Sequence, residues 1–281
     1  PQHQYVVACK SVYFAPNRLP FTEALVMQRL SPKTVSHYLE EKLGTPPARR
    51  LYGAIERGGL HDLAAFPWLL ITMLNQTEKS GPPHSHVDVL SHYVEDAVIK
   101  IATDPGMRVH VEHTLDALAW RMQSTFRSEI PIDEAFEIMA AERGNRGYNL
   151  EHFFSDLVEH DLLVPVGLES LTFARDVLRS HCCARYIERQ EEHMSLLDDI
   201  LATLGRKSRY RWWEDTLTLL AGLENAPSSL LLSLLQDVFL GDGEEVFLAA
   251  RMLRECNKNV DAYLQNYVIG ALLTRLDAQR E

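Results

Sequence analysis

Histidines are the residues of this sequence whose spacing comes nearest to a metal site. Five of them fall into two groups: His84, His86 and His92, then His110 and His113. Imidazole nitrogens at short spacings can bind Zn²⁺. However, His84 lies in a Gly-Pro-Pro loop, and no cysteine or carboxylate stands at a recognised ligand spacing. The sequence therefore predicts solvent-exposed histidines and no metal site.

A second histidine pattern suggests proton transfer. It consists of His152, Asp156, His160 and Asp161. These residues fall on or beside a predicted helix over 149–160, whose apolar face, with Phe153 and Leu157, is typical of a core face. The chain also lacks G-x-S-x-G and H-E-x-x-H motifs. We therefore predict no catalytic residues and no self-contained enzyme.

The cysteines favour neither zinc nor disulfide bonds. There are four, Cys9, Cys182, Cys183 and Cys256, without a C-x-x-C pair or an even ladder of spacings. Secreted disulfide frameworks and zinc sites show such patterns. The sequence therefore predicts buried, reduced thiols in a cytoplasmic protein.

Charge and hydropathy exclude other classes. The 281 residues include 28 Lys plus Arg and 39 Asp plus Glu, a net charge of −11, which does not suit nonspecific binding to phosphate backbones. One basic cluster, Arg206, Lys207, Arg209 and Arg211, precedes Trp212-Trp213 and is predicted as a loop between helices. No apolar run reaches the roughly 18 residues of a membrane helix. We expect neither a nucleic-acid partner nor a membrane.

The elements that would position these residues are mostly helices. Apolar runs at Tyr5–Cys9 and Ala24–Met27 are typical of buried parallel strands. Ser31-Pro32 predicts an N-cap and first helical residue, and Gly44 a stop. Further helices are predicted at about 47–57, 61–66, 68–75, 87–102 and 107–126, and another opens at Ile130 and ends near Gly144.

The second half combines one hairpin with more helices. A helix at 149–160, strands at 162–166 and 171–173 and a helix at 176–190 make a winged-helix outline, and the last of these helices is predicted to be packed in the core. Helices then follow at 195–204, 212–223, 227–240, 244–256 and 260–276. Short amphipathic helices joined by tight turns indicate the start of an α-solenoid.

Several segments, in order along the chain, resemble the NACHT-type signalling ATPases of the STAND class. The segment 61–74 resembles the family's L-x-x-L-A-x-x-P-L-x-L-T-M-L, and 115–123 its L-x-x-L-A-x-x-M-Q. The segment 25–43 is similar to a strand and the helix L-S-x-x-x-(I/V)-x-x-Y-L, and 171–187 is similar to the winged-helix signature F-x-H-x-x-F-x-E-Y-x-A-A-x-Y-L. Residues 5–10 are similar to the strand that ends in a sensor residue.

The resemblance implies a mainly α, multidomain protein. Its parts would be the remnant of an α/β P-loop NTPase sheet at 1–45, a helical domain at 46–105, a winged-helix domain at 106–192 and HEAT-like, α-solenoid helices at 193–281. ATP hydrolysis needs a G-x-x-x-x-G-K-[ST] loop and a strand ending in acidic residues, and neither occurs here. We therefore expect both to precede Pro1 or to belong to another chain, and this chain alone not to be catalytic.

Three residues match cofactor-binding positions of the family. The resemblance implies that Pro67 lies against adenine, that Lys10 replaces an Arg that senses the terminal phosphate, and that Arg175 replaces a His that contacts the β-phosphate of ADP. Each position also has an ordinary explanation. Pro67 can simply open a helix, Lys10 can be a solvated strand end, and Arg175 can pair with a carboxylate such as Asp176. His181, where the family has an aromatic, is predicted to be a packed helix residue.

The resemblance thus implies the regulatory and sensor half of a switch. ATP or ADP, with Mg²⁺, would bind only when the N-terminal half is present. The C-terminal helices would capture a protein ligand, and the activated protein would form homo-oligomers in bacterial antiviral defence or stress signalling. The alternative is a stand-alone helical scaffold that binds another protein and never meets a nucleotide.

Overall fold

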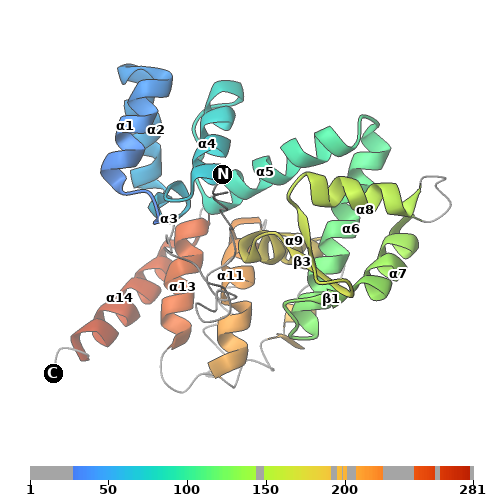
Figure 1. Cartoon of the computed structure of the whole chain (residues 1–281). Coiled ribbons are helices and arrows are strands. Elements are labelled where there is room, and N and C mark those ends of the chain that lie inside the picture. The colour runs from blue at the N-terminus through green and yellow to red at the C-terminus, as the bar shows by residue number, and fades with distance from the viewer. Residues whose placement is uncertain are drawn as a thin grey trace, which may run out of the picture.

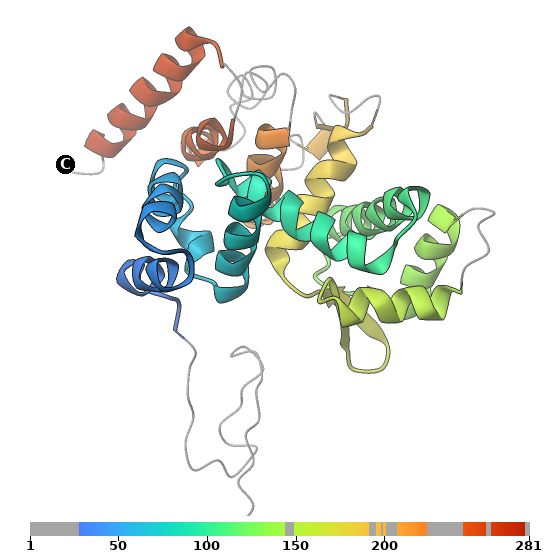
Figure 2. The same ribbon diagram turned by 90° about the horizontal axis from the view of Figure 1, so that it is seen from above.

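The protein is mainly helical, with one small antiparallel sheet (Figures 1 and 2). This computed structural model describes residues 28–143, 149–190, 195–197, 199–200, 207–223, 244–256 and 260–278. The predicted strands at 5–9 and 24–27, Lys10 and the predicted helix at 227–240 lie outside these residues, as does half of the predicted helix at 195–204. The predicted mainly α class is confirmed.

The first group, which we call the N-terminal helices, contains α1 to α5. Their bounds are α1 Pro32–Leu43, α2 Thr45–Arg57, α3 His61–Ala64, α4 Pro67–Lys79 and α5 His86–Ile101. The predicted cap is confirmed, because the Ser31 side chain accepts a hydrogen bond from the Thr34 N–H at 3.1 Å. Gly44 ends α1 at φ 76°, a left-handed angle that glycine adopts at little cost.

The second group, the central unit, contains α6 to α9 and the sheet. Its elements are α6 Pro105–Ser124, β1 Ile130–Pro131, α7 Ile132–Arg143, α8 Leu150–Glu159, β2 Leu163–Val166, β3 Ser170–Phe173 and α9 Asp176–Glu188. The predicted hairpin is confirmed, with Leu163 opposite Phe173. The prediction that Ile130 opens a helix is wrong, because Ile130 pairs with Leu171 and makes β1 a third strand in the order β1-β3-β2.

The third group, the C-terminal helices, comprises α11 Lys207–Leu223, α13 Glu244–Glu255 and α14 Ala262–Ala278. The predicted loop at Lys207–Arg211 is wrong, since these residues form the first turns of α11. Trp213 is buried, and the Trp212 indole N–H donates to the Gln123 carbonyl at 2.8 Å. Both rings therefore pack against the body of the protein.

A continuous apolar core joins the three groups, and α9 lies at its centre (Figure 1). It packs between α6 and α11, with Leu178, Cys182, Cys183 and Ile187 fully or almost fully buried. The small cysteine and alanine side chains allow a close approach of its neighbours. The predicted packing of this helix is confirmed, and that of His181 is confirmed too, because its side chain is fully buried.

None of the helices within the described ranges has the length and apolar character needed to span a membrane.

The last helix, α14, extends from the body of the molecule in both views (Figures 1 and 2). It buries Leu264 and Val268 but exposes several large apolar side chains: Tyr263, Tyr267, Ile269, Leu273 and Leu276.

Candidate functional site

The turn between α3 and α4 presents aromatic rings at the surface. Pro67 is the first residue of α4, where its missing N–H costs no helical hydrogen bond, and its ring is exposed. Trp68 follows and is half-buried. Its indole packs edge-on against the Tyr93 ring of α5, with 4.8 Å between ring centroids. The proline is therefore held beside a fixed aromatic pair.

The structure brings Arg175 to this turn from the distant end of the sheet. Arg175 is exposed and stands immediately before α9, in extended backbone. Its guanidinium carbon lies 5.6 Å from the centre of the Trp68 ring, within the range of a cation–π interaction. Nη1 donates to the Ala174 carbonyl at 2.8 Å. Two of the predicted nucleotide-contacting positions, Pro67 and Arg175, thus lie at one surface.

A second arginine, which the sequence analysis missed, lies on the same turn. The Arg29 guanidinium carbon is 4.9 Å from the centre of the Phe66 ring. The backbone beside it is fixed, because the Leu30 N–H donates to the Ala65 carbonyl at 2.9 Å. No sequence signal marks Arg29, since the pairing depends on the return of the chain to the α3–α4 turn. We call this set the arginine–aromatic cluster: Arg29, Phe66, Pro67, Trp68, Tyr93 and Arg175.

The chemistry of this cluster is recognition of an anion with a planar group. Guanidinium groups donate in a rigid fork that matches phosphate oxygens and stack on aromatic faces, and the three aromatic rings here are half-buried. Tyr93 adds a neutral hydroxyl, because burial and the nearby Asp161 carboxylate raise its pKa, although Arg175 opposes this shift. The cluster contains no nucleophile paired with a base, so it suits binding and not bond cleavage. Lys10 lies outside the described residues.

The predicted exposure of the histidines is only partly right. His84 and His113 are exposed, but His86 and His110 are buried. The error arose because the partners of His86 are distant in the sequence: its ring lies between Asp62 of α3 and Glu255 of α13. No group of three or more His, Cys, Asp or Glu side chains suited to a metal ion occurs among the described residues. The helix with His152 has the predicted core face, with Phe153 and Leu157 buried.

A second charged cluster lies in the core between α6 and α9. The fully buried Asp116 carboxylate is 3.5 Å from Arg185 Nε and pairs with Arg189. Arg185 also donates to Glu112 at 2.6 Å. Burial raises the pKa of Asp116 to about 7, although the two arginines pull it down. We assign this cluster to packing, because the two arginines pair with carboxylates of α6.

The cysteines within the described ranges are free thiols, as predicted. Cys182 and Cys183 are buried on α9 and Cys256 is half-buried. Burial raises the pKa of all three, that of Cys256 to about 11. Since the thiolate is the reactive form, these cysteines are suited to packing and not to nucleophilic chemistry.

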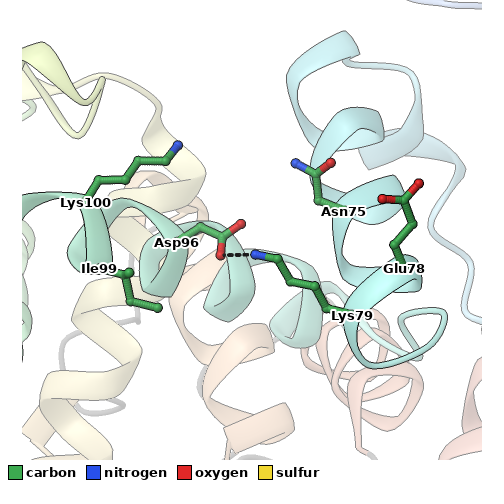
Figure 3. A pocket seen from close by; sticks show the side chains of 6 residues that line it. All are labelled: Asn75, Glu78, Lys79, Asp96, Ile99 and Lys100. Carbon is green, nitrogen blue, oxygen red and sulfur yellow. Dashed lines mark hydrogen bonds and ion pairs between the residues drawn. The ribbon is translucent and has the colours of Figure 1, made fainter. Parts of the chain in front are cut away.

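A shallow hollow lies between α4 and α5 (Figure 3). Lys79 and Asp96 form an ion pair across it at 2.8 Å, and Lys100 lies beside them without joining the pair. The Lys79 side chain is 58% exposed, so solvent screens this pair and weakens it. With charges of both signs and an open floor, the hollow selects no ligand class.

The comparisons with known proteins do not identify a family, so any functional assignment rests on the residues described above. No model of a protein family matches the chain, and no curated protein is significantly similar to it.

Proposed function

We propose that this chain is the regulatory half of a NACHT-class, STAND-type nucleotide-controlled switch. The observation that carries the proposal is the arginine–aromatic cluster. Pro67 and Arg175 belong to two separate segments that resemble the family. Arg175 lies over the Trp68 ring, and Pro67 directly precedes Trp68 in the chain. Under this proposal, residues 46–105 are the helical domain, 106–192 the winged-helix domain, and 193–281 the HEAT-like helices.

The cluster suggests how a nucleotide would act on this half. Arg175 would donate to a phosphate oxygen, while Pro67 and the adjacent rings would contact the base. Because Pro67 lies on α4 and Arg175 precedes α9, a ligand that touches both stabilises the arrangement in which the two helices are close. A ligand shifts such an equilibrium only by its difference in affinity for the two arrangements. ADP is the expected ligand of this closed arrangement.

The other half of the switch would supply ATP hydrolysis, with Mg²⁺ and the glycine-rich loop. The residues described here fit binding of the nucleotide, since they offer guanidinium donors and ring faces, and they provide no group for hydrolysis. Capture of a protein ligand by the C-terminal helices, release of ADP and homo-oligomerisation in bacterial defence or stress signalling complete the proposal. A cytoplasmic location follows from this role.

Nucleotide binding tests the proposal directly. We expect Arg175→Gln to weaken ADP binding to the full-length gene product by roughly 10- to 100-fold, because a charge-assisted hydrogen bond contributes about 1.5–3 kcal/mol. Fluorescence anisotropy with a labelled ADP measures the dissociation constant. Arg49→Gln is the matched control, since Arg49 is exposed on α2 and lies outside the cluster. Equal dissociation constants for the two variants would contradict the proposed role of Arg175.

A second candidate function, a helical scaffold for another protein, is favoured by α14. Its exposed apolar side chains, Tyr263, Tyr267, Ile269, Leu273 and Leu276, make an apolar surface of the kind that marks interaction sites. If the full-length product binds neither ADP nor ATP, this scaffold is the better account. The two candidates are thus separated by the same binding measurement.

A further inference from the structure

The contact between α13 and the N-terminal helices is built on one histidine. His86 is the first residue of α5, and its side chain is 9% exposed. Its Nε2 lies 2.9 Å from Asp62 Oδ1, and its Nδ1 lies 2.6 Å from Glu255 Oε1. We call these three residues, Asp62, His86 and Glu255, the histidine clasp. They come from α3, α5 and the last residue of α13.

The distances favour a charged imidazole, because each ring nitrogen lies close to a carboxylate oxygen. A neutral imidazole has one N–H donor and one bare nitrogen, whereas the imidazolium has two donors. Since both ring nitrogens face a carboxylate oxygen, a neutral His86 would set a nitrogen lone pair against a negatively charged oxygen. The clasp therefore has the charge pattern carboxylate, imidazolium, carboxylate.

Glu255 depends on this charge more than Asp62 does. Its side chain is only 1% exposed, whereas that of Asp62 is 55% exposed. Its second oxygen, Oε2, accepts the His86 backbone N–H at 3.0 Å, at the positive end of the α5 dipole. Without the imidazolium, a buried carboxylate keeps only this N–H and the Nε of Arg254, at 3.3 Å. Loss of one partner of a buried ion pair is strongly destabilising.

The other charged or titratable groups near His86 come from α13, α3 and α5. From α13, Arg254 and Glu255 bring charge, and Cys256 follows as a half-buried thiol whose pKa is raised. From α3, only the Asp62 carboxylate reaches the ring. On α5 itself, the Asp88 carboxylate accepts the His84 backbone N–H at 2.9 Å, and the Asp88 backbone N–H donates to Ser85 Oγ at 3.1 Å. The α11 side approaches through Gly222, which packs on Val87.

We propose that the histidine clasp is a proton-dependent contact that holds α13 on the N-terminal helices and releases it when His86 loses its charge. Burial alone would lower the pKa of His86, but the two carboxylates outweigh it and raise that pKa to about 9. The clasp is therefore closed at neutral pH and opens in alkaline solution, or when another group takes Glu255 from the imidazole. If the protein is the proposed switch, its opening must break this contact; this role rests on the proposed function.

Hydrogen–deuterium exchange of the full-length protein without nucleotide tests the clasp alone. At pH 7 we expect Glu255→Gln to raise the exchange rates in α13 and in the first turn of α5 by roughly tenfold or more, because His86 loses its buried counter-ion. Rates in α6 and α9 should stay unchanged. Lys79→Gln, which breaks the exposed pair with Asp96, is the control and should alter neither region.

Two further measurements keep the test decisive. If Glu255→Gln does not fold, Asp62→Asn, whose carboxylate is half-exposed, should give the same pattern with a smaller amplitude. In the wild type, exchange of α13, corrected for the intrinsic effect of pH, should accelerate between pH 7 and pH 10. Unchanged protection of α13 in the variants, or across this pH range, would overturn the proposal. Since no nucleotide is present, that result is distinct from a failure to bind ADP.

Discussion

The central junction and the histidine clasp both bury charge between elements that are distant in the sequence, but different groups carry the positive charge. In the central junction, Arg185 and Arg189 of the α9 end hold Asp116 of α6. In the clasp, His86 holds Glu255 of α13. A guanidinium stays charged at any practical pH, whereas an imidazolium can lose its proton. The comparison indicates a central junction that keeps its charges in alkaline solution and an edge contact that alkaline solution releases. Because burial raises the pKa of Asp116 to about 7, the central junction loses its negative charge in acid instead.

Apolar packing reinforces this difference. Around Asp116, α9 is covered on two sides, and Trp120 stacks on Tyr186 with 5.2 Å between ring centroids. At the clasp, α13 reaches the N-terminal helices through its last residues, with Arg254 against Gly59 and Glu255 against His86. The central junction therefore combines charge pairing with aromatic stacking, whereas α13 places Leu248 and Met252 in the shared core and meets Gly59 and His86 through charged side chains.

The largest expected effect tests the permanence of the central junction. Arg185→Met should lower the free energy of unfolding by about 3–5 kcal/mol, because it leaves the buried Asp116 with one arginine fewer. Urea denaturation followed by circular dichroism measures the loss. Arg251→Met, which breaks the more exposed pair with Glu214 and Asp215, should cost about 1 kcal/mol or less. Equal losses in the two variants would remove the contrast between buried and exposed pairs.

The pH dependence of stability tests the releasable junction. The pKa of His86 is raised from 6.5 to about 9 in the folded protein, so the folded state binds the proton more tightly than the unfolded state. Its contribution is complete below pH 6.5 and is lost as pH rises through about 9, a loss of about 3 kcal/mol. Urea unfolding of the wild type and His86→Gln between pH 6 and pH 10 measures it. The gap between the two proteins should shrink with rising pH; a constant gap contradicts the assignment.

The smallest expected effect concerns the contact of α11 with α5, which lies between the two junctions. A Cβ at Gly222 would stand 2.6 Å from Val87 Cγ2, closer than two carbons can approach. Gly222→Ala should therefore cost about 1–3 kcal/mol by overpacking, with a lowered Tm in calorimetry. Gly270→Ala on α14 is the control, since a Cβ there meets no atom within 4 Å. If both variants keep the wild-type Tm, α11 and α5 are more loosely packed than described.

Local signals predicted the helices well and the isolated strand poorly. Ser31-Pro32 marks the start of α1 because a cap and a first-turn proline act within one turn. Ile130 has no such local mark. It becomes part of β1 only because the β2–β3 hairpin offers Leu171 as a partner, so periodicity alone extends the following helix over it. Lys207–Arg211 was similarly misread, because its charges are typical of a loop, while Trp212 and Trp213 anchor α11 to the core.

The candidate sites also divide into those with a local sequence signal and those without one. Pro67 and Arg175 were found from the sequence because each belongs to a recognisable segment. Arg29 and the histidine clasp were not, since their partners lie far away: Glu255 contacts His86 from the opposite end of the chain. Spacing rules detect ligands on one helix or loop and cannot detect such pairs.

The sequence by itself determined the mainly helical class, the position of most helices and the hairpin, because each depends on residues within a few turns of one another. Only the tertiary structure decided which charges are buried together. It brought Arg175 to Trp68 and Glu255 to His86, and burial then changed what those groups can do. Which charged groups pair across a fold depends on where the apolar faces of the helices pack together. The local sequence does not encode that packing.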